Sequence, residues 1–167
     1  TMDIHGPYLP PREYLPSGYV PGDFLSYFRF IRLSEQALGS EELSPRIQNL
    51  RQRYAAEIRL TRDELENFIL DLEEQGRWKD ALVWVLSDHG EAFGEHGAAG
   101  HGRGYLSSEV LQIPLWLKLP RSWGIPPRTI GPPVSAYDIL QTTLSLLGLP
   151  GLRESFGVDL TPLLKGK

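Results

Sequence analysis

Hydrophobic and polar positions along the chain predict a long helix, two strands and a second helix, in that order. Between residues 44 and 75, hydrophobic residues recur mostly every three or four positions, and arginines and glutamates fill the positions between them. Ser44 suits an N-cap, Pro45 suits the first helical position, and Gly76 follows the last turn. The pattern therefore predicts one long helix whose charged side chains form a solvated face.

Two continuous hydrophobic runs follow this helix, over residues 81–86 and 113–119. Continuous hydrophobicity over the length of a strand is typical of strands covered on both faces, as in parallel sheets flanked by helices. Residues 137–147 then predict a short amphipathic helix that ends at Gly148 and Pro150. This order of elements predicts an α/β fold.

The first 43 residues have a different character, because their first half is rich in proline. Proline fixes φ and removes a hydrogen-bond donor, so this half predicts an extended arm with turns. Composition alone fits a linker equally well, but the many aromatic residues between Tyr8 and Phe30 favour a segment that packs against the rest. We therefore divide the chain into an arm over residues 1–43 and an α/β portion over residues 44–167.

Composition and charge exclude several classes of function. The 167 residues include 17 Lys and Arg, 21 Asp and Glu and no Cys, which gives a net charge of −4. Without cysteine there is no disulfide, thiolate metal ligand or thiol nucleophile within these residues. A mildly acidic chain without a basic stripe argues against nucleic acid as a partner. No hydrophobic run approaches the roughly 18–20 residues of a membrane-spanning helix.

Candidate chemistry is concentrated in the glycine-rich loop over residues 87–102. Asp88 and His89 come directly after the first hydrophobic run, where ligands bind in open α/β sheets. A carboxylate beside an imidazole suits a divalent metal, and Zn²⁺ or Mn²⁺ more naturally than Ca²⁺. His96 and His101 lie in the same loop, and the remaining histidine, His5, lies in the arm. Two alternatives require no functional site. Asp88 and His89 could cap a helix, with the imidazole hydrogen-bonded inside the fold, and His96 could lie in an exposed turn.

This loop also resembles a known metal motif. The segments Ser87-Asp88-His89-Gly90-Glu91, Phe93-Gly94-Glu95-His96-Gly97 and Gly100-His101-Gly102 resemble the C-terminal motif of the sulfatase branch of the alkaline phosphatase superfamily. The resemblance continues in order along the chain. It includes His5-Gly6-Pro7-Tyr8, the helix before the motif, the strand entry at residues 108–115, the helix at 134–144 and the ending at 157–164.

The resemblance implies an alkaline-phosphatase-like sandwich, a sheet flanked by helices, whose N-terminal half is missing from these residues. It implies that Asp88 and His89 bind a divalent metal ion, which is Ca²⁺, Zn²⁺, Mn²⁺ or Mg²⁺. His5 and His101 would be catalytic, contacting the transferred sulfuryl or phosphoryl oxygens or protonating the leaving group. Glu91 and His96 would orient His89 and the loop.

The sequence departs from the family in two ways. It contains no Cys-x-Pro-x-Arg or Ser-x-Pro-x-Arg nucleophile motif. We therefore expect a fragment of a sulfatase-like hydrolase that is inactive alone, with the missing N-terminal half as a partner and a small-molecule, lipid or glycan ester as substrate. His101 also stands where sulfatases commonly carry a sulfate-binding lysine. This difference favours phosphate esters over sulfate esters as substrates, or a phosphoethanolamine- or phosphoglycerol-type transferase. The non-enzymatic alternative is a stand-alone binding module.

A missing half has consequences for the isolated chain. It would leave an unpaired sheet edge beside residues 82–86 and exposed hydrophobic surface, and such edges tend to pair with other chains. We therefore expect self-association or a disordered arm. Family relatives are often periplasmic, secreted or membrane-anchored, but these residues do not assign a compartment.

Overall fold

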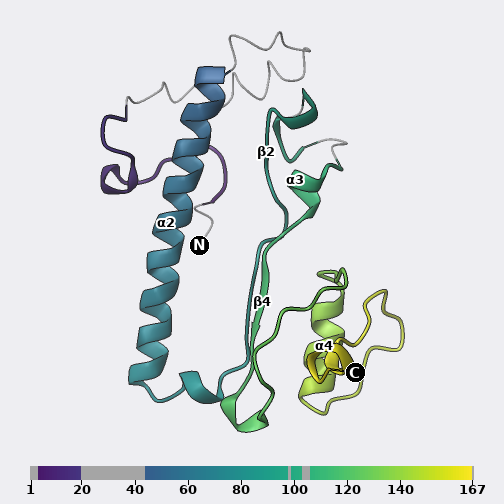
Figure 1. Cartoon of the computed structure of the whole chain (residues 1–167). Coiled ribbons are helices and arrows are strands. Elements are labelled where there is room, and N and C mark those ends of the chain that lie inside the picture. Colours follow the sequence, from purple (N-terminus) through teal and green to yellow (C-terminus); the bar gives the residue numbers. More distant parts are fainter. Residues whose placement is uncertain (1–3, 20–43, 98, 103–105, 167) are drawn as a thin grey trace. The chain divides into compact units, whose positions relative to one another are not determined.

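The computed structural model describes residues 4–19, 44–97, 99–102 and 106–166 (Figure 1). Over these residues it is a mixed helix-and-sheet structure. Its helices, strands and 3₁₀ helices (η) are η1 (Arg12–Tyr14), α2 (Ser44–Glu74), η2 (Trp78–Asp80), β1 (Val83–Leu86), β2 (Ala92–Phe93), η3 (Glu95–Gly97), β3 (Ala99–Gly100), α3 (Ser108–Leu111), β4 (Leu115–Lys118), η4 (Arg121–Trp123), α4 (Asp138–Leu146) and α5 (Thr161–Leu164).

The chain divides into two compact units. The first comprises residues 1–78 and 85–116, and the second comprises residues 79–84 and 117–167. β1 pairs with β4 in one two-stranded sheet, and both strands contribute residues to each unit. β2 pairs with β3 in a second, antiparallel sheet, with Ala92 opposite Gly100 and Phe93 opposite Ala99.

The long helix predicted over residues 44–75 is confirmed as α2, and its end is fixed by glycine. Gly76 adopts a φ of 68°, a left-handed conformation that costs glycine little. The Gly76 amide then donates to the Glu73 carbonyl at 2.9 Å, and the Arg77 amide donates to the Leu72 carbonyl at 2.8 Å. These bonds satisfy carbonyls that would otherwise lack partners at the end of the helix.

The core of the first unit lies where the arm, α2 and β2 meet. Tyr8, Leu50 and Phe93 are buried there, and Ile47 and Tyr54 pack against them. The rings of Tyr8 and Tyr54 lie 5.4 Å apart at 70°, and those of Tyr54 and Phe93 lie 5.1 Å apart at 57°. Edge-on and tilted aromatic contacts of this kind add to the burial of hydrophobic surface. The arm is thus anchored to α2 beside the loop that carries the candidate chemistry.

The two hydrophobic runs are confirmed as strands, although they are less covered than the sequence predicts. The β1 side chains from Val83 to Val85 are only partly buried and Leu86 is exposed. Trp116 in β4 is exposed as well. The reason is that, among the described residues, β1 and β4 form a sheet of two strands, which provides less cover than a wide parallel sheet.

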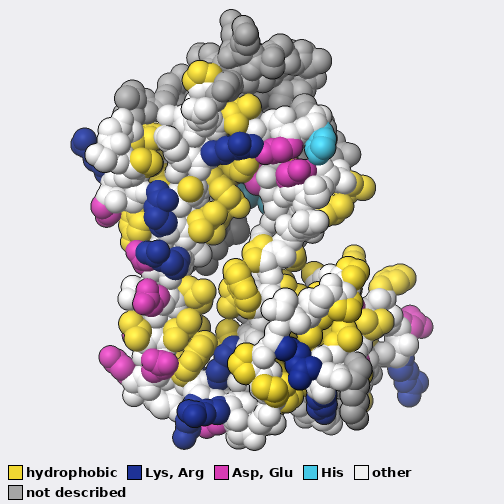
Figure 2. All heavy atoms as spheres, in the orientation of Figure 1, with side chains coloured by type: hydrophobic (Ala, Val, Ile, Leu, Met, Phe, Trp, Pro, Cys, Tyr) yellow, Lys and Arg dark blue, Asp and Glu magenta, His cyan; other side chains and the backbone are white. Residues whose placement is uncertain are grey.

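The second unit is organised around α4, which confirms the helix predicted over residues 137–147. The buried Asp138 carboxylate accepts bonds from the backbone amides of Ser135, at 2.7 Å, and Val158, at 2.9 Å. The Thr142 hydroxyl accepts a bond from the Leu160 amide at 2.9 Å. These bonds fix the C-terminal segment against α4. Hydrophobic side chains nevertheless reach the surface of this unit (Figure 2), and Phe156 is 97% exposed.

The predicted arm over residues 1–43 is described in part. Residues 4–19 include η1 and contact α2, whereas residues 1–3 and 20–43, with the aromatic run from Phe24 to Phe30, lie outside the described residues. None of the described helices combines the length and hydrophobicity required to span a bilayer.

Candidate functional site

The loop after β1 is held in shape by its own hydrogen bonds and by α3. The His89 amide donates to Asp88 Oδ1 at 3.0 Å, and the Ser87 hydroxyl donates to the His89 carbonyl. The Gly90 amide donates to the Val110 carbonyl at 2.7 Å. A Cβ at Gly90 would lie 2.0 Å from the Glu109 carbonyl oxygen, so only glycine allows the loop to approach α3 so closely. The start of the loop is therefore fixed where β1 ends.

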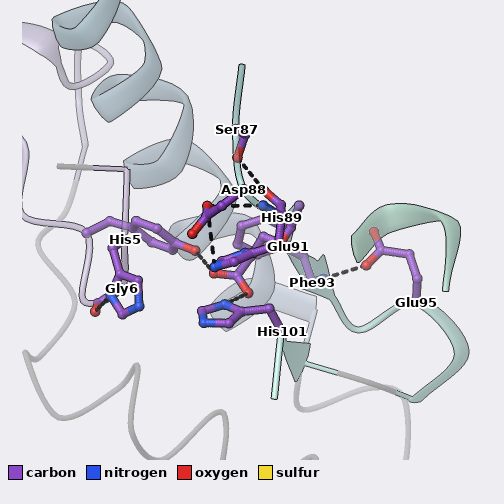
Figure 3. Close-up of polar contacts among 11 residues, drawn as sticks. His5, Gly6, Ser87, Asp88, His89, Glu91, Phe93, Glu95 and His101 are labelled. Atoms are coloured by element: carbon purple, nitrogen blue, oxygen red, sulfur yellow. Dashed lines mark hydrogen bonds and ion pairs between the residues drawn. The ribbon is translucent and has the colours of Figure 1, made fainter. Parts of the chain in front are cut away.

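Three histidines from distant parts of the sequence converge beside this loop (Figure 3). The rings of His89 and His101 are stacked, with centroids 3.9 Å apart and planes 25° apart. The ring of His5 meets that of His101 edge-on, with centroids 5.2 Å apart and an angle of 68°. His5 comes from the arm, His89 from the loop after β1, and His101 directly follows β3. The structure thus brings together the two predicted catalytic residues and one predicted metal ligand.

Each of the three imidazoles is anchored through the same nitrogen, Nδ1. The acceptor is the Gly6 carbonyl for His5, at 2.7 Å, and the Gly90 carbonyl for His89, at 2.9 Å. For His101 it is Glu91 Oε1, at 3.1 Å. Carbonyl and carboxylate oxygens only accept, so Nδ1 carries the proton in each ring. Nε2 is therefore the nitrogen that remains for a ligand, a metal or a proton transfer.

Glu91 links this cluster to the hydrophobic core. Its side chain is only 7% exposed, and its Oε2 accepts a hydrogen bond from the hydroxyl of the fully buried Tyr8. Its Oε1 faces His101. Burial raises the pKa of the neighbouring Tyr54, and the Glu91 charge adds to that rise. Glu91 thus contacts His101, which lies in the same loop, and its role in orienting His89 stays a prediction.

Asp88 and His89 fit two positions of a metal site. The Asp88 side chain is 89% exposed, and its Oδ1 lies 3.7 Å from His89 Nε2. Two metal–ligand bonds of about 2.0–2.2 Å each can span that separation. Because His89 donates its Nδ1 proton to a backbone carbonyl, its Nε2 has the arrangement usual for a metal-bound histidine. Within the part of the chain that is described, no group of three or more potential ligand side chains is assembled.

His96 is exposed and contacts Glu109. Its side chain is 71% exposed, and its Nε2 lies 3.7 Å from Glu109 Oε1. Its φ of 54° places it in the left-handed region inside η3. The structure thus brings His96 to Glu109, and the contacts described here do not join it to His89.

Sequence reasoning overlooked Tyr8 as a member of the site. The motif His5-Gly6-Pro7-Tyr8 does not by itself indicate a role for Tyr8. Its hydroxyl bonds a residue that lies 83 positions away in the sequence. The available signal was a tyrosine three positions after a candidate catalytic histidine, which does not by itself indicate the partner.

Comparisons with known proteins give a consistent result. A family model described as Sulfatase matches residues 1–149. Steryl-sulfatase from Mus musculus is 33% identical over 108 residues, covering 57% of this chain and 17% of the mouse protein. The chain therefore spans a small part of that relative's length.

Solved structures point the same way. The phosphonate monoester hydrolase SpPMH from Silicibacter pomeroyi is 25% identical, with a TM-score of 0.75 over 98% of this chain and 36% of the hydrolase. The phosphonate monoester hydrolase of Agrobacterium radiobacter is 29% identical, with a TM-score of 0.65 over 72% of this chain and 24% of that enzyme.

Proposed function

The chain belongs to the sulfatase family of the alkaline phosphatase superfamily, and on that basis we propose that it forms part of the catalytic centre of a metal-dependent ester hydrolase. The substrates are sulfate, phosphate or phosphonate esters. The observation that supports this most is the convergence of His5, His89 and His101, each anchored at Nδ1. Such an arrangement leaves the Nε2 atom of each ring for chemistry beside a fixed loop.

His5 and His101 act on the oxygens of the transferred group. Negative charge grows on the nonbridging and leaving oxygens during sulfuryl or phosphoryl transfer, so positioned donors lower the barrier. In the doubly protonated ring both nitrogens donate: Nδ1–H stays on its fixed acceptor, and Nε2–H can bond such an oxygen or pass its proton to the leaving group. Glu91 and Tyr8 hold His101 in the required orientation.

Asp88 and His89 hold the divalent metal, with Asp88 Oδ1 and His89 Nε2 as the donor atoms. When bound, a divalent cation polarises the ester oxygens and lowers the pKa of a nucleophile. The metal's remaining ligands and the nucleophile come from polypeptide other than these 167 residues. This is supported by the absence of the family's nucleophile motif here and by the greater length of the relatives. The 167 residues alone are then inactive.

Hydrolysis of phosphate or phosphonate esters is the preferred reaction. His101 replaces the lysine that binds sulfate in many family members, and two of the similar structures are phosphonate monoester hydrolases by name. The relatives named by the comparisons are sulfatases and hydrolases, so they do not favour the transfer of a phospho-head group.

The test uses the complete enzyme that contains this chain, with 4-nitrophenyl sulfate, 4-nitrophenyl phosphate and 4-nitrophenyl phenylphosphonate as substrates. We expect hydrolysis of at least one ester, fastest for the phosphonate or phosphate. His101→Ala should lower kcat by about 100-fold or more, the usual contribution of a positioned acid or base. His96→Ala is the matched control and should leave kcat within a few-fold. Hydrolysis of none of the three, or equal losses in the two variants, would contradict the proposal.

A further inference from the structure

A cavity in the first unit, away from the histidine cluster, has the features of an anion-binding site. It lies between residues 9–19 of the arm and Arg53 of α2, and its volume is about 660 Å³. None of the three clustered histidines is among the described residues that line it. The cavity is thus distinct from the candidate catalytic centre, although one wall residue, Leu9, also lines a neighbouring cavity that contains His5.

Arg53 is the unusual residue of this cavity. It is only 8% exposed, and its Nη1 is buried without a hydrogen-bond partner in the described part of the chain. A buried guanidinium nitrogen that lacks a partner is costly, because its N–H groups have lost their water and gained no acceptor in exchange. Glu57 lies one turn further along α2 and accepts a bond from the Leu9 amide at 2.7 Å. It is among the residues that line the neighbouring cavity rather than the cavity of Arg53.

The other residues that line the cavity define what could satisfy Arg53. Arg12 contributes a second positive charge, and no Asp or Glu is among the described lining residues. Leu9, Leu15 and two prolines form an apolar wall, and Tyr19 adds an aromatic ring. A ligand with an anionic group for Arg53 and a hydrophobic body for this wall matches both halves of the lining.

We propose that this cavity binds a small organic anion, with its carboxylate, sulfonate or phosphonate group paired to Arg53 and its apolar body against Leu9 and Leu15. The guanidinium is planar and presents parallel N–H donors, which suits bidentate pairing with such oxyanions. In the free chain, the unpartnered Arg53 Nη1 lowers the free energy of unfolding. Ligand binding offsets this loss. The inference does not depend on the proposed ester hydrolysis.

Because Arg53 Nη1 is buried without a partner, replacing Arg53 should affect ligand binding and stability in opposite directions. Arg53→Met keeps an unbranched side chain of similar length but removes the buried charge. It should weaken binding at least about 10-fold and leave the free chain at least as resistant to unfolding as the wild type. A residue that merely supports the fold would show the opposite, a lower melting temperature in the variant without ligand.

The experiment is a titration of the chain with sodium benzoate, followed by ¹H–¹⁵N NMR of the Arg53 side chain and the Leu9 and Tyr19 amides. We expect saturable shifts with a Kd on the order of 1 mM. Benzamide, which has the same shape but no charge, should bind at least about 10-fold more weakly, the result of losing about 1.4 kcal/mol. Arg53→Met should lose binding by a similar factor or more.

The matched control is Arg62→Met, because Arg62 lies on the same helix but is exposed and bonds Asp63 at 2.6 Å. It should leave the affinity for benzoate unchanged. Equal affinity for benzoate and benzamide, or binding by Arg53→Met within twofold of the wild type, would overturn the proposal. So would benzoate shifts confined to His101 and its neighbours, which would place the anion at the histidine cluster.

Discussion

Replacing Tyr8 by phenylalanine tests whether Glu91 is held by the core. The ring and its contacts with Tyr54 and Phe93 are retained, but the hydroxyl that donates to Glu91 Oε2 is lost. Because the Glu91 side chain is only 7% exposed, water cannot easily replace that donor. Hydrogen bonds to charged groups contribute about 1.5–3 kcal/mol to stability, so we expect a loss of that size. For a chain of this length the melting temperature should fall by about 3–12 °C.

Tyr19→Phe is the matched control, because it also removes the hydroxyl of an arm tyrosine, but from a neutral hydrogen bond to α2. The Tyr19 hydroxyl donates to Asn49 Oδ1 at 3.0 Å. A neutral bond of this kind contributes only about 0.5–1.5 kcal/mol. Urea unfolding of the wild type and the two variants gives the three free energies of unfolding. If Tyr8→Phe loses no more stability than Tyr19→Phe, the Tyr8 hydroxyl does not support a buried Glu91 charge.

Three further predictions concern the loop and α2. Gly90→Ala should destabilise the first unit strongly and broaden the NMR signals of the loop, since its Cβ would lie 2.0 Å from a backbone oxygen of α3. The hydrogen bond from Arg62 lowers the pKa of Asp63, so this pair stabilises the fold above the ordinary Asp pKa and its contribution is lost as the pH falls. A ¹³C titration should show the Asp63 midpoint return towards its ordinary value in Arg62→Gln. Arg51→Gln, which removes the exposed ion pair with Glu95, should change the free energy of unfolding by less than about 1 kcal/mol.

The sequence predicted those parts of the fold that depend on local patterns. The recurrence of hydrophobic residues and the Ser44, Pro45 and Gly76 signals located α2 to within one residue of its end. Continuous hydrophobic runs located β1 and β4. The β2–β3 ladder could not be predicted, because each of its strands has only two residues and carries no alternation of hydrophobic and polar positions.

The candidate site was predictable as a set of residue types but not as a set of contacts. Asp88 and His89 follow a strand, and that position together with the pairing of a carboxylate and an imidazole made them candidates. The stacking of His89 on His101 depends on how β2 and β3 fold the loop back, which no local pattern encodes. The bond from Tyr8 to Glu91 joins residues 83 positions apart, so it follows only from the tertiary structure.

The proposal that Asp88 and His89 hold a divalent cation beside His101 is tested most directly by titrating the chain with Mn²⁺ and following the imidazole NMR signals. Paramagnetic broadening should affect His89 and its stacked neighbour His101 at the lowest Mn²⁺ concentrations, while the exposed His96, which contacts Glu109, keeps its line width. Asp88→Asn should raise the Mn²⁺ concentration needed by about 10-fold or more. Broadening of His96 at the same concentration as His89, or an unchanged titration in Asp88→Asn, would contradict the assignment of this pair as metal ligands.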